Sequence, residues 1–384
     1  MSTIAPGDAR ALTRALVEID SRNPSLVPGA PGEQACAAFL RGVLDAWGFR
    51  TEVQEAAPGR PNLVARIGDA RGGRSLMFNG HLDVVGIEGM THSPFSAVAR
   101  EGRLYGRGSA DMKGGIAAMC AAAHLAAAHG IAGEIIVAAV ADEEYVSIGT
   151  RALIEQGVRA DACVVTEPTK LAIMPAHRGF VWLEVEVAGR AAHGSRWDIG
   201  VDAIRHAGLL LTELDRVDAE VLPQREHPLL GRGSLHASLI QGGLGYSTYP
   251  DRCVIGLERR TIPGETTSDV IAEMERACEA VRAKRSSFAA QVRLVGAQGP
   301  SDVSVDAPLV LALGEALHAE GEEVHIEGMS AWTDAALLND AGIPAVCFGP
   351  GDISLAHAAE EYIPLDEIDR ARDVLSALAR RWCG

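Results

Sequence analysis

Short apolar runs alternate with helix-like segments through the first half of the chain. The runs SLMFN, EIIVAAV and ACVVT predict buried strands at 75–79, 134–140 and 162–166. Segments of helical character separate them, at 112–129 and 150–157. Strands that alternate with helices indicate a mostly parallel sheet that is covered by helices on both faces. The first half of the chain is therefore predicted to form an α/β domain.

Two helices are predicted before the first of these strands. Asp8 caps the first helix, and Leu12, Leu16 and Ile19 lie on one face of it. The second helix ends at Gly48 and has apolar side chains at helical spacing. They are Cys36, Phe39, Leu40, Val43, Leu44 and Trp47.

The pattern changes near residue 177. VWLEVEV at 181–187 alternates between apolar and polar side chains, as a half-exposed strand does. The next helix is predicted to have an apolar face made of Ile204, Ala207, Leu211 and Leu214. Further strands at 235–240, 253–258 and 288–295 follow, with a helix between the last two that carries Val270, Ile271, Met274, Cys278 and Val281. This β-α-β-β-α-β order is that of the ferredoxin-like unit.

After this segment the chain returns to the first pattern, with helices at 308–320 and 365–382 and a strand at 344–348. The sequence therefore predicts a discontinuous α/β domain at 1–176 and 296–384, and an α+β domain inserted at 177–295.

Charge and cysteine content narrow the range of functions. The 35 Lys and Arg against 51 Asp and Glu give a formal net charge of −16. Nucleic acids and anionic membranes bind basic patches, so neither is expected as a partner. The seven cysteines include no CxxC pair, and the N-terminal MSTIAPGDAR has no segment typical of a signal peptide. We therefore expect reduced, mostly buried thiols in a cytoplasmic protein.

The stretch 114–133 contains no Asp, Glu, Lys or Arg and is long enough to cross a bilayer. It consists mostly of Ala and Gly and also contains His124 and His129. This composition favours a tightly packed buried helix over a membrane span.

Polar side chains follow the predicted strands of the α/β domain where these strands end. They are His81 and Asp83 after the first strand, Asp142, Glu143 and Glu144 after the second, Glu167 after the third, Asp111 before the Ala-rich helix, and His357 after the strand at 344–348. Ligands bind α/β sheets at the carboxyl ends of the strands. Each residue alone is ordinary in a loop, but together they bring histidines and several carboxylates to one edge. That is a ligand set for divalent metal ions.

Eight short motifs carry a resemblance that covers nearly the whole chain. They are GHLDVV (80–85), GRGSADMKGG (106–115), ADEEYVSIGT (141–150), TEPT (166–169), AAHGS (191–195), ERRTIPGE (258–265), TDA (333–335) and AHAAEEYI (356–363). In this order they resemble the acetylornithine deacetylase/succinyl-diaminopimelate desuccinylase family of di-zinc amidohydrolases, which includes aminoacylase and glutamate carboxypeptidase relatives. Each motif alone is weak, and the ordered set is specific. The resemblance implies a zinc-exopeptidase-like metal domain and an inserted lid domain that forms a homodimer.

The resemblance also implies two zinc ions per chain, for which Co²⁺ or Mn²⁺ can substitute. His81 and Glu167 would bind one ion, Glu144 and His357 would bind the other, and Asp111 would bridge the two. The peptide bond that follows Asp111 is expected to be cis.

Catalytic roles follow from the same resemblance. Glu143 would be the general base that takes a proton from water activated by the metals and passes it to the leaving amine. Asp83 is expected to orient the imidazole of His81. His193, from the inserted domain of the same or of the partner subunit, would donate to the oxyanion. Arg260 would anchor the substrate carboxylate.

The inserted domain departs from the family pattern at three points. Ser247 stands three residues before Pro250, where the family usually has Asn. It would contact substrate with a shorter reach, or it would be only a turn residue. Glu258 replaces the usual Asp, and Arg196-Trp197 replaces a Pro that usually follows His-Gly. These changes leave the preference for the acyl group open.

The predicted reaction is hydrolysis of an N-acyl amino acid, and a dipeptidase or carboxypeptidase reaction is the alternative. Arg178 would bind a carboxylate or pair with surface acids. A non-catalytic metal-binding homologue is disfavoured because Glu143 is present. Nucleotide binding is not expected, because Asp111 stands where a GxGxxG phosphate loop requires Gly. No cysteine lies in a motif typical of a nucleophile.

Overall fold

The computed structural model describes residues 4–69 and 71–384. Residues 1–3 of the N-terminal segment MSTIAPGDAR, in which no signal peptide is predicted, lie outside the described residues. The chain divides into two compact units, called here unit 1 and unit 2. Unit 1 consists of Met1–Pro175, Val303–Glu327 and Thr333–Gly384, and unit 2 consists of Ala176–Asp302 and Gly328–Trp332.

Unit 1 is built on a mixed sheet with the strand order β1-β2-β6-β3-β7-β17-β8. These strands are β1 (Arg50–Ala57), β2 (Arg60–Gly68), β3 (Ser75–His81), β6 (Glu134–Val140), β7 (Ala162–Val165), β8 (Ile173–His177) and β17 (Ala345–Cys347). The central strands β6, β3, β7 and β17 are parallel to one another. The strands β1, β2 and β8 pair antiparallel at the sides. The predicted mostly parallel sheet is confirmed, and the β1–β2 hairpin adds to it.

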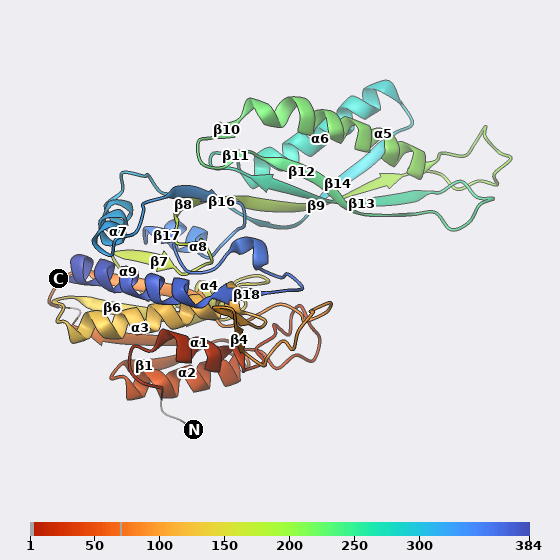
Figure 1. Cartoon of the computed structure of the whole chain (residues 1–384). Coiled ribbons are helices and arrows are strands. Elements are labelled where there is room, and N and C mark those ends of the chain that lie inside the picture. The colour runs from red at the N-terminus through yellow and green to blue at the C-terminus, as the bar shows by residue number, and fades with distance from the viewer. Residues whose placement is uncertain (1–3, 70) are drawn as a thin grey trace. The chain divides into compact units, whose positions relative to one another are not determined.

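Helices flank this sheet (Figure 1). They are α1 (Ala9–Val17), α2 (Gln34–Ala46), α3 (Gly114–Ala128), α4 (Ile148–Glu155), α7 (Pro308–Ala319), α8 (Ala335–Asp340) and α9 (Leu365–Cys383). Shorter elements of the unit are β4 (Val98–Arg100), β5 (Arg103–Tyr105), η1 (Ser109–Lys113), η4 (Ile353–Leu355) and β18 (Tyr362–Pro364). The Asp8 side chain caps α1 by accepting from the backbone N–H of Ala11, as predicted.

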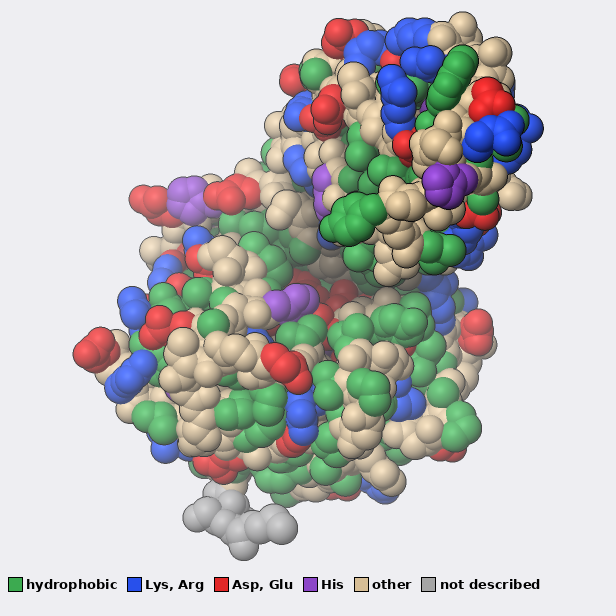
Figure 2. All heavy atoms as spheres, turned by 90° about the vertical axis from the view of Figure 1, so that its right-hand side faces the viewer, with side chains coloured by type: hydrophobic (Ala, Val, Ile, Leu, Met, Phe, Trp, Pro, Cys, Tyr) green, Lys and Arg blue, Asp and Glu red, His purple; other side chains and the backbone are tan. Residues whose placement is uncertain are grey.

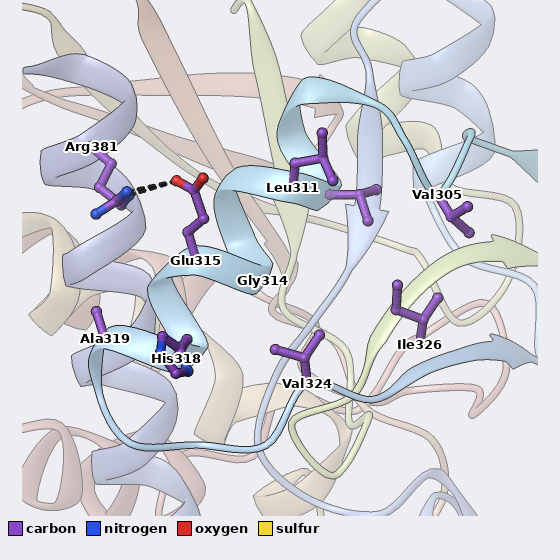
Figure 3. A pocket seen from close by; sticks show the side chains of 10 residues that line it. Val305, Leu311, Gly314, Glu315, His318, Ala319, Val324, Ile326 and Arg381 are labelled. Carbon is purple, nitrogen blue, oxygen red and sulfur yellow. Dashed lines mark hydrogen bonds and ion pairs between the residues drawn. The ribbon is translucent and has the colours of Figure 1, made fainter.

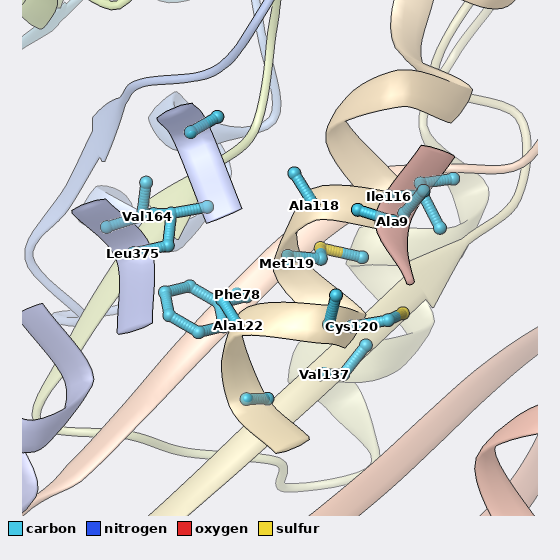
Figure 4. Close-up of a cluster of buried hydrophobic side chains, with 14 of the residues drawn as sticks. Ala9, Phe78, Ile116, Ala118, Met119, Cys120, Ala122, Val137, Val164 and Leu375 are labelled. Carbon is cyan, nitrogen blue, oxygen red and sulfur yellow. The ribbon is translucent and has the colours of Figure 1, made fainter. Parts of the chain in front are cut away.

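The main core lies between the sheet and the layer formed by α1, α2, α3, α7 and α9. Alternate residues of β3 and β6 point into it, and these include Leu76, Phe78, Ile135 and Val137. Figure 4 shows Phe78 beside α3, close to Ala122. The core removes these apolar side chains from water, and this burial is the dominant favourable contribution to folding.

The Ala-rich helix α3 is a buried core helix, as predicted. Residues 114–123 are all buried, and the helix packs against α1 and α9. Within the described part of the chain, no helix is long and apolar enough to span a membrane. All seven cysteines are free and buried, which also agrees with the prediction.

Unit 2 contains a four-stranded antiparallel sheet in the order β12-β13-β9-β14. Its principal elements are β9 (Gly179–Ala188), α5 (Ala203–Arg216), β12 (Ser234–Gly242), β13 (Arg252–Thr261), α6 (Thr267–Lys284) and β14 (Ala289–Gln298). Helices α5 and α6 contribute buried apolar side chains to one core with this sheet. Both the chain order and the strand order are those of a ferredoxin-like fold.

Short elements complete the chain. They are η2 (Val217–Val221), η3 (Leu222–Gln224), β10 (Glu226–His227), β11 (Gly231–Arg232), β15 (Ser301–Asp302) and β16 (Ile326–Met329). The domain boundary expected after residue 295 would fall inside β14.

On the face drawn in Figure 2, Lys and Arg side chains are interspersed with Asp and Glu.

The predicted apolar face of α5 was partly wrong. Leu210 is buried, whereas Leu211 is only partly buried and Ile204 is 44% exposed. Three consecutive leucines occupy 209–211, so the spacing alone did not fix which one faces the core. In the first helix, Ile19 lies beyond the end of α1 and packs against the core from the following loop.

Candidate metal centre

The predicted ligands of unit 1 meet at the carboxyl ends of adjacent parallel strands. His81 is the last residue of β3, Glu144 follows β6, and Glu167 follows β7. Asp111 lies in η1, directly before α3, and His357 lies after η4. The sheet order β6-β3-β7 makes these strand ends neighbours, although they are far apart in the sequence.

Asp111 lies between the two histidines. Its Oδ1 is 3.0 Å from His81 Nε2, and its Oδ2 is 3.6 Å from His357 Nε2. Glu167 Oε1 is 3.9 Å from His81 Nε2, while Glu144 Oε2 is 2.8 Å from His357 Nε2. Each histidine therefore has its own carboxylate, and one oxygen of Asp111 faces each histidine.

Two groups of side chains in the described residues have the geometry to hold a metal ion. One group is His81, Asp111 and Glu144, and the other is His81, Glu143 and Glu167. In each group the candidate ligand atoms lie within 4.8 Å of one another. Both groups differ from the expected ligand sets: the first joins Glu144 to His81, the second includes Glu143, for which the sequence predicts a catalytic role, and neither contains His357.

The chemistry of these side chains fits divalent cations. Four carboxylates crowd together, and Glu144 Oε1 is buried without a hydrogen-bond partner among the described residues. Burial, together with neighbouring carboxylates, raises the pKa of Glu143 and that of Glu167 well above their ordinary values. The hydrogen bond to Glu144 raises the pKa of His357 to about 9. A pair of divalent ions would compensate this negative charge.

Asp83 is buried beside His81 but contacts it differently from the expectation. The backbone carbonyl of Asp83 accepts from His81 Nδ1 at 2.9 Å, whereas its Oδ1 lies 3.7 Å from that nitrogen. The carboxylate instead accepts from the backbone N–H groups of Glu143 and Glu144, each at 3.2 Å. Burial raises the pKa of Asp83 to about 7. Asp83 thus holds both the imidazole and the turn after β6.

Glu361 was not predicted as a site residue, and it fixes the loop that carries Asp111. One carboxylate oxygen accepts from the backbone N–H groups of Ala110 and Asp111, at 3.0 and 3.1 Å. The other accepts from Gly108 N at 3.0 Å and from Arg107 Nη1 at 2.7 Å. Glu361 lies in the motif AHAAEEYI, four residues after His357, and this place in the motif was the available signal.

The backbone around Asp111 has two special features. The Asp111–Met112 peptide bond is cis, which confirms the expectation. Gly115, at the start of α3, approaches the strand end so closely that a Cβ would lie 2.0 Å from the carbonyl oxygen of Thr166. Only glycine allows this contact, which brings the helix that follows Asp111 against the residue that precedes Glu167.

The remaining predicted residues lie in unit 2. His193 is exposed, and its Nδ1 is 2.8 Å from Ser195 Oγ. The carbonyl of Ser247 accepts from Gly194 N at 2.8 Å. The segments that carry these two residues are therefore paired through their backbones, and the catalytic and substrate-binding roles of His193 and Ser247 stay predictions.

The two arginines differ in their surroundings. Arg260 donates from Nε to Glu258 Oε1 at 2.5 Å, and its guanidinium lies 5.6 Å from the ring centroid of Phe180. Arg178 donates to the carbonyl of Leu230 at 2.6 Å, and its Nε is buried without a hydrogen-bond partner in the described chain. Among the described residues Arg178 forms no ion pair, so the expected pairing with surface acids is not observed.

A separate pocket of about 560 Å³ lies between α7 and the segment leading into β16 (Figure 3). Its walls are mainly apolar and include Leu311, Val324 and Ile326, and Arg381 forms an ion pair with Glu315 at 2.6 Å beside it. None of the predicted site residues lines this pocket.

The chain is similar to known proteins over its full length. The chain is 33% identical over 396 residues to an acetylornithine deacetylase of Myxococcus xanthus, with 100% of both chains covered. Its fold is similar to that of an M20 family metallo-carboxypeptidase from Sulfolobus solfataricus, with a TM-score of 0.79, 18% identity, and 98% and 99% of the two chains covered. It is also similar to a dinuclear metal-binding peptidase of the M20 family from Bacillus subtilis, with a TM-score of 0.75, 18% identity, and 98% and 97% covered.

The model of peptidase family M20/M25/M40 matches residues 77–381, which include every ligand and catalytic candidate named above. The resemblance found in the motifs is thereby confirmed, as is the expectation of a metal-dependent hydrolase. The chain belongs to peptidase family M20/M25/M40 and is an acetylornithine deacetylase-like hydrolase of that family.

Proposed function

We propose that this protein is a di-zinc amidohydrolase that cleaves the amide bond of N-acyl amino acids. The observation that carries the proposal is the disposition of Asp111, which turns one carboxylate oxygen toward His81 and the other toward His357. That arrangement suits a bridging ligand between two metal ions. The full-length similarity to an acetylornithine deacetylase supports a small acylated amino acid as substrate.

His81 and Glu167 would hold one ion, Glu144 and His357 the other, and Asp111 both. When bound, such ions polarise the scissile carbonyl and lower the pKa of water. Glu143 is the proposed general base. Its backbone N–H is tied to Asp83, and its Oε2 lies 4.0 Å from His81 Nε2. The side chain would take a proton from the attacking water and deliver it to the leaving amine.

A dipeptidase or carboxypeptidase of the same family is the second candidate. Similarity in fold to a metallo-carboxypeptidase is compatible with it, because both reactions need the same metal centre. The two differ in the group on the acyl side of the scissile bond. The decisive experiment is a hydrolysis screen of N-acetyl, N-succinyl and N-formyl amino acids beside dipeptides, with added Zn²⁺ or Co²⁺. Faster turnover of acylated amino acids supports the proposal, and faster turnover of dipeptides contradicts it.

A non-catalytic metal-binding homologue is the remote alternative. It would bind metal ions and hydrolyse none of these compounds. The presence of Glu143 disfavours this alternative, because such a homologue would have no need of a general base.

We also propose that unit 2 supplies substrate contacts. Arg260 would bind the substrate carboxylate, with Arg178 as a second cation and Ser247 as a polar contact. His193 would donate to the oxyanion of the tetrahedral intermediate. Because His193 is not a metal ligand in this proposal, its removal should affect chemistry and spare the metals.

His193→Ala should lower kcat by about 10²- to 10³-fold, the range found when one oxyanion donor is removed. Metal content should stay at the wild-type value, measured by elemental analysis of the purified protein. The exposed His325→Ala, outside both the metal centre and unit 2, is the matched control and should retain wild-type kcat. Loss of metal from His193→Ala would mean that its role is misassigned.

A homodimer through unit 2 is proposed as the assembly. Strand β12 is at an edge of its sheet, and it carries Leu239 at 71% exposure and Ile240 at 53% exposure. An exposed edge strand with apolar side chains favours pairing with another chain. The free, buried cysteines support a reducing compartment, and we propose a cytoplasmic location.

Leu239→Glu should convert the dimer to a monomer, because the charge would be buried against the partner. Light scattering after size-exclusion chromatography gives the molar mass. Leu311→Glu, at 53% exposure on α7 of unit 1, is the control and should remain dimeric. A monomeric wild-type protein, or dissociation of the control alone, would rule out this interface.

A further inference from the structure

A buried asparagine connects the two chain segments on which the candidate metal centre rests. Asn23 lies in the loop after α1 and is fully buried. Its Nδ2 donates to Asp83 Oδ2 at 2.8 Å and to Asp142 Oδ1 at 3.0 Å. Asp83 follows β3, and Asp142 follows β6. One amide group therefore joins the ends of two adjacent parallel strands.

The orientation of this amide is fixed by its surroundings. Its Oδ1 accepts from Ser25 N at 2.9 Å and from Arg60 Nη2 at 3.2 Å, while both carboxylates lie on the Nδ2 side. Turning the amide over would set oxygen against two carboxylates and NH₂ against two donors. The side chain therefore accepts through its carbonyl oxygen on one side and donates both N–H bonds of its NH₂ group on the other.

The loop that carries Asn23 is itself held against the strand end. Ser21 Oγ donates to the carbonyl of Leu82 at 2.7 Å, and the backbone N–H of Asn23 donates to the carbonyl of Val84 at 2.8 Å. Segment 21–23 is therefore hydrogen-bonded to segment 82–84 on both sides of Asp83. Any movement of Asn23 would be passed directly to that segment.

Arg60 completes the arrangement. Its guanidinium forms a bidentate contact with Glu33, at 2.6 and 2.7 Å, and also donates to Asp142 Oδ1 at 2.9 Å. Arg60 and Glu33 are both buried. On one side, the Oδ1 of Asn23 accepts from Arg60, which Glu33 holds in place. On the other side, its NH₂ group donates to the two aspartates.

The two aspartates that Asn23 contacts fix the segments on which the candidate metal ligands lie. Asp83 accepts from the backbone of Glu143 and Glu144, and its carbonyl accepts from His81 Nδ1. Asp142 directly precedes Glu143 and adopts a positive φ of 67°. Hydrogen bonds to its own carboxylate and carbonyl from residues 145–147 define the turn.

We infer that Asn23 is a positioning residue of the metal centre. Its amide sets the spacing between the segment that carries His81 and the segment that carries Glu143 and Glu144. The inference rests on the proposed metal-binding function. Removing the amide frees the two segments to move apart and leaves two buried carboxylates without their shared donor.

The test uses the full-length protein with metal removed by a chelator. Co²⁺ affinity is measured by competition with a chromophoric chelator, the Co²⁺ absorption spectrum is recorded, and the Tm of the metal-free protein is determined. Asn23→Ala should weaken Co²⁺ binding by about 10- to 100-fold, the range typical for residues that orient metal ligands. Asn23→Asp should weaken it further although its shape is nearly unchanged, because a third carboxylate would face Asp83 and Asp142.

Asn339→Ala is the matched control. The side-chain amide of Asn339 exchanges two hydrogen bonds with the backbone of Ala345, both at 2.9 Å, and Asn339 is not one of the proposed ligands. This variant should lower Tm and leave Co²⁺ affinity and the spectrum unchanged. A purely structural role for Asn23 would give the same result in Asn23→Ala, and wild-type Co²⁺ affinity in both Asn23 variants would overturn the inference.

Wild-type measurements separate the inference from the proposed function. Wild-type protein that binds Co²⁺ but hydrolyses no N-acyl amino acid would contradict the proposed reaction only. Wild-type protein that binds Co²⁺, with Asn23 variants that bind it equally well, would contradict the inference only. If Asn23→Asp does not fold, the comparison of Asn23→Ala with Asn339→Ala decides the question.

Discussion

Glu143→Ala should retain both metal ions and lose turnover. The proposed base acts on the proton of the attacking water, and positioned acid–base groups contribute about 10²- to 10⁴-fold to rate. The kcat should fall by that factor. The turn that carries Glu143 is fixed through backbone N–H groups by Asp83, so truncating the side chain should leave the neighbouring ligand Glu144 in position. Steady-state kinetics and elemental analysis of the same preparation measure both quantities.

Two further variants sharpen this experiment. Glu143→Gln keeps the shape and removes the base, so its kcat should fall like that of Glu143→Ala. Glu155→Ala, an exposed glutamate at the end of α4, is the control and should match wild type. Near-normal kcat in Glu143→Ala would contradict the mechanism. Loss of metal would instead indicate that Glu143 is a ligand, as its place in the group with His81 and Glu167 allows.

The parts of the fold that could be predicted are those in which one pattern of burial dominates the sequence. The bounds of β6 agree with the run at 134–140, because a central strand buried on both faces carries mostly apolar side chains, here at every position except Glu134. The alternation in β9 was equally clear, since one face of that sheet covers a core and the other does not. The candidate ligands His81, Glu144 and Glu167 could be placed together because parallel strands end at one edge.

Other parts could not be predicted from local patterns. Strand β1 has the sequence RTEVQEAA and buries only Gln54 fully, so it has no apolar periodicity to mark it as a strand. The network of Asn23, Arg60 and Glu33 joins residues from three separate segments, each of which looks like an ordinary polar position. Glu361 likewise looks like a surface acid until its four hydrogen bonds to the 107–111 loop are known. Such contacts exist only after the chain has folded.

Asp111→Ala should lower the metal content of the protein more than the removal of any other single proposed ligand. We expect close to two metal ions per wild-type chain and fewer than one in the variant. The physical reason is that each oxygen of Asp111 faces a different histidine, so its removal takes one ligand from both sites at once. Hydrolysis should fall below detection, because both proposed sites would lose the ligand that they share.

Asp111→Asn separates charge from shape in this prediction. It has the size of the native side chain, but it replaces one anionic oxygen with NH₂, which cannot bind a cation. Glu155→Ala, at an exposed carboxylate at the end of α4, is again the control and should keep both ions. A variant at 111 that keeps one tightly bound ion would show that Asp111 serves only one site, and one that keeps two would exclude bridging.

Thermal unfolding gives an independent measure of metal binding by the wild-type protein and by Asp111→Ala. A ligand that binds only the folded protein adds about 2.7 kcal/mol to stability at a hundredfold excess over its Kd. Added Zn²⁺ should therefore raise the Tm of metal-free wild-type protein and leave that of Asp111→Ala almost unchanged. Because this shift does not depend on the substrate, it tests the bridging role of Asp111 even if the preferred acyl group differs from the one proposed. An equal rise of Tm in both proteins would contradict a shared ligand.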